Sequence, residues 1–135
     1  MKEFLEDNRK IFVEKNKHHK FKELKSSSSS NIGIFNNMKD VFIASAMLGY
    51  SNDKRESLNS NRDIFDVNVL KKHDYTLIYS IFLDYTGDAD LLEKGEIMSV
   101  IEEYANAGID ILYDIVNQSG DALNNLVEEI QIYYL

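Results

Sequence analysis

The stretch DLLEKGEIMSVIEEYANAGIDILYDIV, residues 90–116, decides the fold. Its apolar residues recur at intervals of three and four, which is typical of a helix that packs along one face. Asp90 is a suitable N-cap for this helix. Around Gly108, the run Ala105-Asn106-Ala107-Gly108 puts small side chains together, so we expect another backbone to approach there.

Three other segments have helical spacing. Asn36-Asn37 can cap a helix that Gly49 ends, and a second helix begins at His73-Asp74 and ends at Thr86-Gly87-Asp88. After Ser119-Gly120, Asp121 can cap a last helix. Its apolar residues are Leu123, Leu126, Val127, Ile130 and Tyr133-Tyr134-Leu135.

The segments before and between these helices are less regular. Over residues 2–17, apolar residues at intervals of seven and eight suit a narrow helical stripe. Residues 50–63 are polar and predict a loop. Partial alternation over residues 64–70 allows one short strand there, and a helical turn stays open.

A serine run follows Lys25 at residues 26–30, and such a run predicts a flexible linker. We therefore expect an N-terminal helical arm with its linker over residues 1–30 and a helical body over residues 31–135. The predicted class is mainly α: a compact four- to five-helix bundle, with one short strand allowed near 64–70, preceded by a flexible arm.

Length and composition limit the classes of protein. A chain of 135 residues fits one domain, and the absence of cysteine excludes disulfides and a thiol nucleophile. The N-terminus has no apolar signal segment, and no apolar run reaches the roughly 20 residues that a membrane helix needs. We expect a cytoplasmic protein with no membrane partner.

The net charge of −8 is unevenly distributed. Residues 73–135 carry thirteen Asp or Glu and a single cation, Lys94. Such a surface repels nucleic-acid phosphates and attracts a basic partner, although a solvated acidic face is the more ordinary interpretation.

The sequence contains little that indicates catalysis. His18 and His19 lie beside the expected linker, where a metal site lacks a firm scaffold, and there is no glycine-rich phosphate loop. Asp110 and Asp114 share a helical face, but exposed carboxylates are usually only solvated. We predict no catalytic residue, no cofactor and no metal site.

Two groups of residues are candidates for binding. Glu102, Glu103, Asp110 and Asp114 form the candidate partner-binding group. Lys54, Arg55 and Arg62 form the candidate nucleic-acid-binding group, which the lysine-rich arm would assist. Pairing of this basic loop with the acidic helices of its own fold is the favoured alternative for the second group.

Four short sequence motifs occur in a recognisable order. They are Asn37-Met38-Lys39-Asp40-Val41-Phe42, Ala46-Met47-Leu48-Gly49-Tyr50, Tyr85-Thr86-Gly87-Asp88 and the run from Glu102 to Leu112. Over roughly residues 36–115 the chain resembles small accessory proteins encoded beside bacterial DNA phosphorothioation (Dnd) systems.

The resemblance implies a role in a bacterial defence island that modifies or restricts DNA, and it brings no catalytic residues. We therefore expect a non-catalytic adaptor, not an enzyme, whose partner is a co-encoded defence-system protein. A nucleic-acid-binding accessory protein is the alternative. The oligomeric state stays open.

Overall fold

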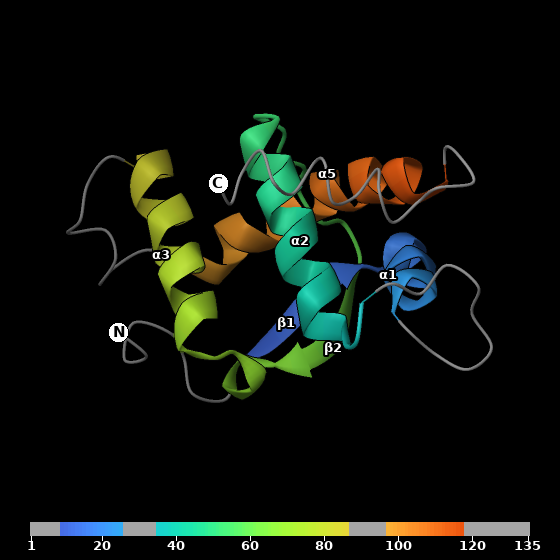
Figure 1. Cartoon of the computed structure of the whole chain (residues 1–135), viewed down its shortest axis with the longest axis horizontal. Helices are drawn as coiled ribbons and strands as arrows, with labels where there is room; N and C mark the ends of the chain where they lie inside the picture. Colours follow the sequence, from blue (N-terminus) through green and yellow to red (C-terminus); the bar gives the residue numbers. More distant parts are fainter. Residues whose placement is uncertain (1–8, 26–34, 87–96, 118–135) are drawn as a thin grey trace.

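A computed structural model of the chain describes residues 9–25, 35–86 and 97–117. Figure 1 shows the described helices packed beside a small sheet. The strands are β1 (Lys10–Glu14) and β2 (Asn61–Asp66), and the helices are α1 (His18–Leu24), α2 (Met38–Ser51), α3 (Lys72–Thr86) and α5 (Ile97–Asn117). Short 3₁₀ turns at Lys15–Lys17 and Val67–Val69 follow the two strands.

Helix α5 is the long helix that the sequence predicts, and α2 packs across it as its main neighbour. A Cβ on Gly108 would overlap the carbonyl oxygen of Ser45, so the close backbone approach expected at this glycine is confirmed. The proposed cap Asp90 lies outside the described residues, as does the helix expected over residues 121–135.

Helix α2 begins where the sequence indicates, because the Asn37 side chain accepts a hydrogen bond of 2.9 Å from the Asp40 amide. The expected end at Gly49 is wrong. The helix continues to Ser51, and Gly49 lies inside it. A glycine is needed there because a Cβ would lie 2.8 Å from the carbonyl carbon of Tyr104 in α5.

The two strands form an antiparallel pair with a register shift between Ile11 and Phe12. The strand allowed near residues 64–70 is present over 64–66 as the end of β2. The helix expected over residues 2–17 is wrong over β1. Ile11 and Val13 alternate into the core in β1, and this two-residue period is that of a strand.

The described part of the expected N-terminal arm belongs to the core. Ile11 and Val13 of β1 and Phe21 and Leu24 of α1 are buried in the same cluster as α2 and α5. Because these apolar side chains need cover, residues 10–25 pack against the body. The predicted boundary at residue 30 falls outside the described residues and stays a prediction.

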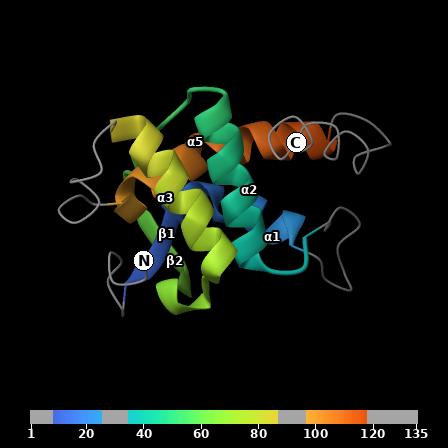
Figure 2. The same cartoon turned by 60° about the vertical axis from the view of Figure 1, so that its left-hand side comes forward.

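Helix α3 confirms the helix predicted from His73-Asp74 onward. Its first turn is held by a buried ion pair of 3.0 Å between Asp74 and Lys39 of α2. Figure 2 shows α3 running beside α2 on the side away from α1.

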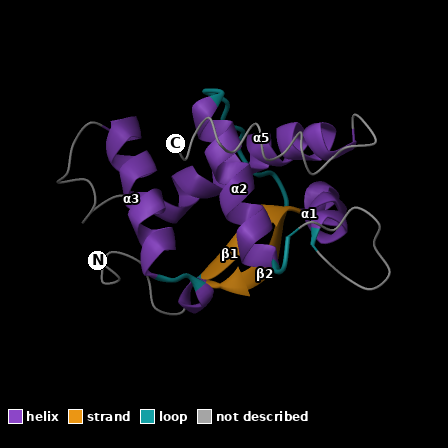
Figure 3. Cartoon of the chain, in the orientation of Figure 1, coloured by secondary structure: helices purple, strands orange, loops and turns teal. Residues whose placement is uncertain are grey.

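The mainly α class is confirmed (Figure 3). The described helices pack beside a two-stranded sheet, however, so the four- to five-helix bundle is not confirmed. No helix in the described ranges is long and apolar enough to cross a membrane.

Candidate interaction surface

Glu102 is almost completely buried, with 5% of its surface exposed. Its two carboxylate oxygens accept hydrogen bonds of 2.8 Å from the two terminal nitrogens of Arg9. The amide of Phe12 donates a further bond of 2.7 Å to the same carboxylate. Phe12 lies at the irregularity in β1. Glu102 therefore anchors the bulged strand to α5 and offers little surface to a partner.

Asp110 joins α5 to the first 3₁₀ turn and to α1. Its carboxylate oxygens lie 2.8 Å from the Lys17 ammonium and 2.7 Å from that of Lys20. Burial raises the pKa of the Asp110 carboxyl, but the hydrogen bonds from Lys17 and Lys20 outweigh it, so its pKa is below its ordinary value. The Lys17 ammonium also lies 2.8 Å from Glu56.

Glu103 and Arg55 belong to the two different groups predicted from the sequence, and the structure brings them together. The Arg55 guanidinium lies 3.0 Å from the Glu103 carboxylate. The loop after α2 is fastened to α5 at the same place, because the Glu56 amide donates to the Glu103 carbonyl at 3.1 Å. The favoured pairing of the basic loop with the chain's own acidic helix is thus confirmed for Arg55.

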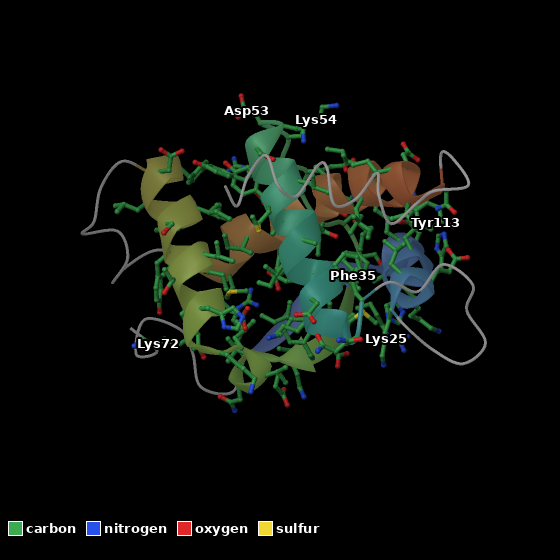
Figure 4. The ribbon with its side chains drawn as sticks, in the orientation of Figure 1. Lys25, Phe35, Asp53, Lys54, Lys72 and Tyr113 are labelled. Carbon is green, nitrogen blue, oxygen red and sulfur yellow. The ribbon has the colours of Figure 1, made fainter. Side chains whose placement is uncertain are left out.

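Asp114 is exposed on α5 and makes no ion pair with any residue in the described ranges. Lys54 and Arg62 are exposed too, and within those ranges neither has an ion-pair partner. Lys54 follows the end of α2, where Figure 4 shows its side chain pointing away from the body. Arg62 lies in β2 opposite Val13, so the two cations are on different elements.

Tyrosine side chains surround the Arg55–Glu103 pair. The Arg55 guanidinium carbon lies 4.5 Å from the centre of the Tyr85 ring, a cation–π geometry. The Tyr104 ring contacts the rings of Tyr50 and Tyr85 edge-on, with centroids 5.6 and 6.2 Å apart. We call this set the Tyr–Arg cluster; its members are Tyr50, Arg55, Asp84, Tyr85, Glu103 and Tyr104.

Tyr50 closes the cluster on the side of α3. Its hydroxyl donates to the Asp84 carboxylate. The hydrogen bond to Asp84, followed by burial, raises the pKa of Tyr50 to about 12. The hydrogen bond joins α2 to α3, and the ring contact of Tyr50 with Tyr104 joins α2 to α5.

Three members of the cluster are exposed, namely Arg55, Asp84 and Tyr85, and the Tyr85 side chain is 44% exposed. Tyr104 is buried and supports the ring of Tyr85 from below. Helical spacing alone does not distinguish Tyr85, an exposed tyrosine whose ring packs on Tyr104, from a tyrosine of the core.

The side chains of the cluster are of types that can bind a partner. It offers aromatic faces, a guanidinium, two carboxylates and phenol groups, which one hydrogen bond, one ion pair and three aromatic contacts connect. Among the described residues, no group of three or more His, Asp or Glu side chains is placed to hold a metal ion.

The fold and its pairings define a small, mainly α protein in which β1 and α1 share one core with α2 and α5. A family model described as DNA sulphur modification system-associated protein 4 matches residues 10–132, and the chain belongs to this family. The comparisons with curated proteins and with solved structures found no match.

Proposed function

We propose that this chain is a non-catalytic accessory protein that binds another protein of a DNA sulphur modification system through the Tyr–Arg cluster. The observation that carries the proposal is the position of Arg55 between the half-exposed Tyr85 ring and the Glu103 carboxylate. Membership of a family associated with such a system supplies the context.

Tyrosine and arginine are the residue types that most often dominate the binding energy of protein interfaces. Here Arg55 is held in place before binding, so a partner loses less side-chain entropy on docking against it. Because the guanidinium already has a carboxylate partner, a phosphate would have to compete with Glu103 for it.

The charge distribution also favours a protein partner. The described residues carry thirteen Lys or Arg and thirteen Asp or Glu, so the net charge of −8 lies in residues 1–8, 26–34, 87–96 and 118–135. The described residues, which carry no net charge, give little attraction to nucleic acid. The acidic segments would steer a basic protein surface toward the chain.

The test is affinity capture of the tagged chain from its native host, with nuclease treatment of the eluate before mass spectrometry. We expect a stoichiometric protein from the same system. Truncation of a central interface tyrosine typically costs about 2 kcal/mol or more, which is about thirtyfold in affinity. Tyr85→Ala should weaken the complex by this amount.

Val69→Ala is the matched control, because Val69 is an apolar residue of similar exposure in the 3₁₀ turn before α3. It should bind normally. A partner retained equally by Tyr85→Ala and Val69→Ala would contradict the assignment of the cluster. Recovery of nucleic acid alone would overturn the proposal in favour of binding through Lys54 and Arg62.

The acidic face of α5 is tested separately with Asp114→Lys. This residue lies outside the Tyr–Arg cluster and makes no ion pair that the reversal would break within the described ranges. Reduced binding would extend the surface along α5 to Asp114. Unchanged binding would restrict the surface to the cluster.

A further inference from the structure

Two rows of basic side chains run along α1 and the 3₁₀ turn before it. Lys17 and Lys20 face α5, where both ammonium groups pair with Asp110. The members of the second row are spaced by three, four and three residues: Lys15, His18, Lys22 and Lys25. This spacing places them on a different side of the turn and the helix. They make no ion pair with any residue that the structure describes.

Arg62 of β2 continues the second row onto the sheet. It pairs in register with Val13 of β1, shortly before α1 begins. The amide of Lys15 donates a hydrogen bond of 2.7 Å to the carbonyl oxygen of Ser60, so the start of the row is bound to the start of β2. Figure 3 shows α1 beside this end of the sheet. We call the following residues the basic row: Lys15, His18, Lys22, Lys25 and Arg62.

The surroundings of His18 show that members of the basic row influence one another. Burial lowers the pKa of the His18 imidazole, and the positive charges of Arg62 and Lys22 lower it further. The charge of Asp63 acts in the opposite direction. Helix α1 and strand β2 thus bring basic side chains together whose mutual repulsion an anion would relieve.

We propose that the basic row binds the phosphate backbone of duplex DNA. The row is about 15 Å long from Lys15 to Lys25 at the rise of a helix. One strand of a duplex carries a phosphate about every 3.4 Å along its axis, so the row can lie beside about four phosphates. The family's association with a DNA modification system favours DNA over RNA. This surface is separate from the Tyr–Arg cluster and goes beyond the function proposed for it.

The composition of the basic row favours DNA over a protein partner. Lysine is depleted from the centre of protein interfaces, where aromatic and other apolar side chains are enriched. The apolar residues of α1, Phe21 and Leu24, are buried, so this side of the helix offers charge without an apolar centre. The row itself contains no Phe, Tyr or Trp ring on which an unpaired base could stack, which favours a duplex over a single strand.

The basic row can act although the described residues carry no net charge. At physiological ionic strength, exposed charges are screened beyond about 8 Å, so only nearby groups affect a bound phosphate. Of the nearby carboxylates, Asp110 is paired with two lysines and Glu23 accepts the Tyr113 hydroxyl. Asp63 is exposed next to Arg62 and weakens the row at that end. We therefore expect weak binding that depends strongly on salt.

The test is titration of the purified full-length chain into a fluorescently labelled DNA duplex, followed by anisotropy at several salt concentrations. About four phosphate contacts predict a slope of about −3.5 for log affinity against log salt concentration. Lys22→Glu combined with Arg62→Glu should lower the affinity about tenfold or more and reduce the slope by about 2. Because no other protein takes part, failure of this test leaves the function proposed for the Tyr–Arg cluster standing.

Lys71→Glu combined with Lys72→Glu is the matched control, because it makes the same change in net charge at the start of α3. Both lysines are exposed and make no ion pair within the described ranges. Figure 4 shows Lys72 on the opposite side of the molecule from Lys25. The control should bind like the wild type. Equal losses in both double variants would overturn the assignment to the basic row, and tighter binding of single strands would overturn the duplex.

The imidazole of His18 gives a second readout by nuclear magnetic resonance. A phosphate beside it favours the protonated form, so the pKa of His18 should rise when the duplex is added. A merely structural effect of the charge reversals would not produce this rise in the wild type. An unchanged His18 pKa in a protein that binds the duplex would place the DNA elsewhere, and absence of binding at low salt would overturn the proposal altogether.

Discussion

Gly49 of α2 and Gly108 of α5 lie against each other at the point where the two helices cross. A Cβ on Gly108 would lie 2.8 Å from the Gly49 amide nitrogen and would overlap the carbonyl oxygen of Ser45. A Cβ on Gly49 would overlap the carbonyl oxygen of Tyr104. Both overlaps are with backbone, which cannot move aside as a flexible side chain does. The approach of α2 to α5 therefore depends on both glycines.

The first prediction is that Gly108→Ala strongly destabilises the protein. In an exposed helix this change would be favourable by about 1 kcal/mol. Here the helices must separate, and we expect a loss of about 4 kcal/mol or more in the free energy of unfolding. Urea denaturation followed by circular dichroism measures this loss. Asp114→Ala on the exposed face of α5 should change the free energy by less than about 0.5 kcal/mol; an equally mild Gly108→Ala would show that the helices are not so close.

The second prediction separates two adjacent glutamates. Glu102→Gln removes the charge that Arg9 and the Phe12 amide bind in a buried setting, and we expect a loss of about 3 kcal/mol in the free energy of unfolding. Glu103→Gln makes the same chemical change in a more exposed pair and should cost about 1 kcal/mol or less. Chemical denaturation of both variants gives the comparison, and equal costs would refute the anchoring role of Glu102.

The third prediction concerns acid. The pKa of Asp110 is lowered in the folded protein, so the unfolded chain binds a proton first as the pH falls below the ordinary value of 3.8. The stabilisation is complete above that value and is lost as the pH falls through the lowered folded pKa. We therefore expect Asp110→Asn to flatten the fall in stability that the wild type shows as the pH drops below 3.8. Denaturation curves measured across this pH range test the prediction. A variant whose stability falls with pH as steeply as that of the wild type would contradict it.

The fourth prediction distinguishes Asn37 from Asn36. Only the Asn37 side chain accepts the Asp40 amide at the start of α2. Replacing an N-cap asparagine by alanine costs about 1 kcal/mol, so Asn37→Ala should lower the midpoint of thermal unfolding by several degrees. Asn36→Ala leaves the cap in place and should melt like the wild type. Identical melting of both variants would mean that the cap does not stabilise α2.

Local sequence patterns determined several elements of this protein. The three- and four-residue spacing around Ile101 and Ile109 determined α5, the Asn37 side chain determined the start of α2, and Gly108 marked the helix contact. Each of these depends on residues within a few positions of one another, so local spacing and capping chemistry were sufficient to predict them.

The Tyr–Arg cluster was only partly predictable, because sequence patterns are local and the cluster joins residues that are distant in the sequence. Arg55 and Glu103 are both among the residues that the sequence singled out, but they belonged to opposing hypotheses. Their pairing, and the tyrosines that enclose it, depend on α2, α3 and α5 meeting at one end of the molecule. Nothing in the local spacing of Tyr85 indicates that it faces Arg55.

The tertiary structure alone decided what each charge does and where the N-terminal segment lies. Glu102 and Glu103 are adjacent and chemically identical, yet one anchors β1 from within the core while the other holds Arg55 near the surface. Ile11 and Val13 form a strand because β2 offers unpaired backbone groups and the core has room for their side chains. Burial and long-range pairing are set by the whole packed chain, and no short window of sequence contains that information.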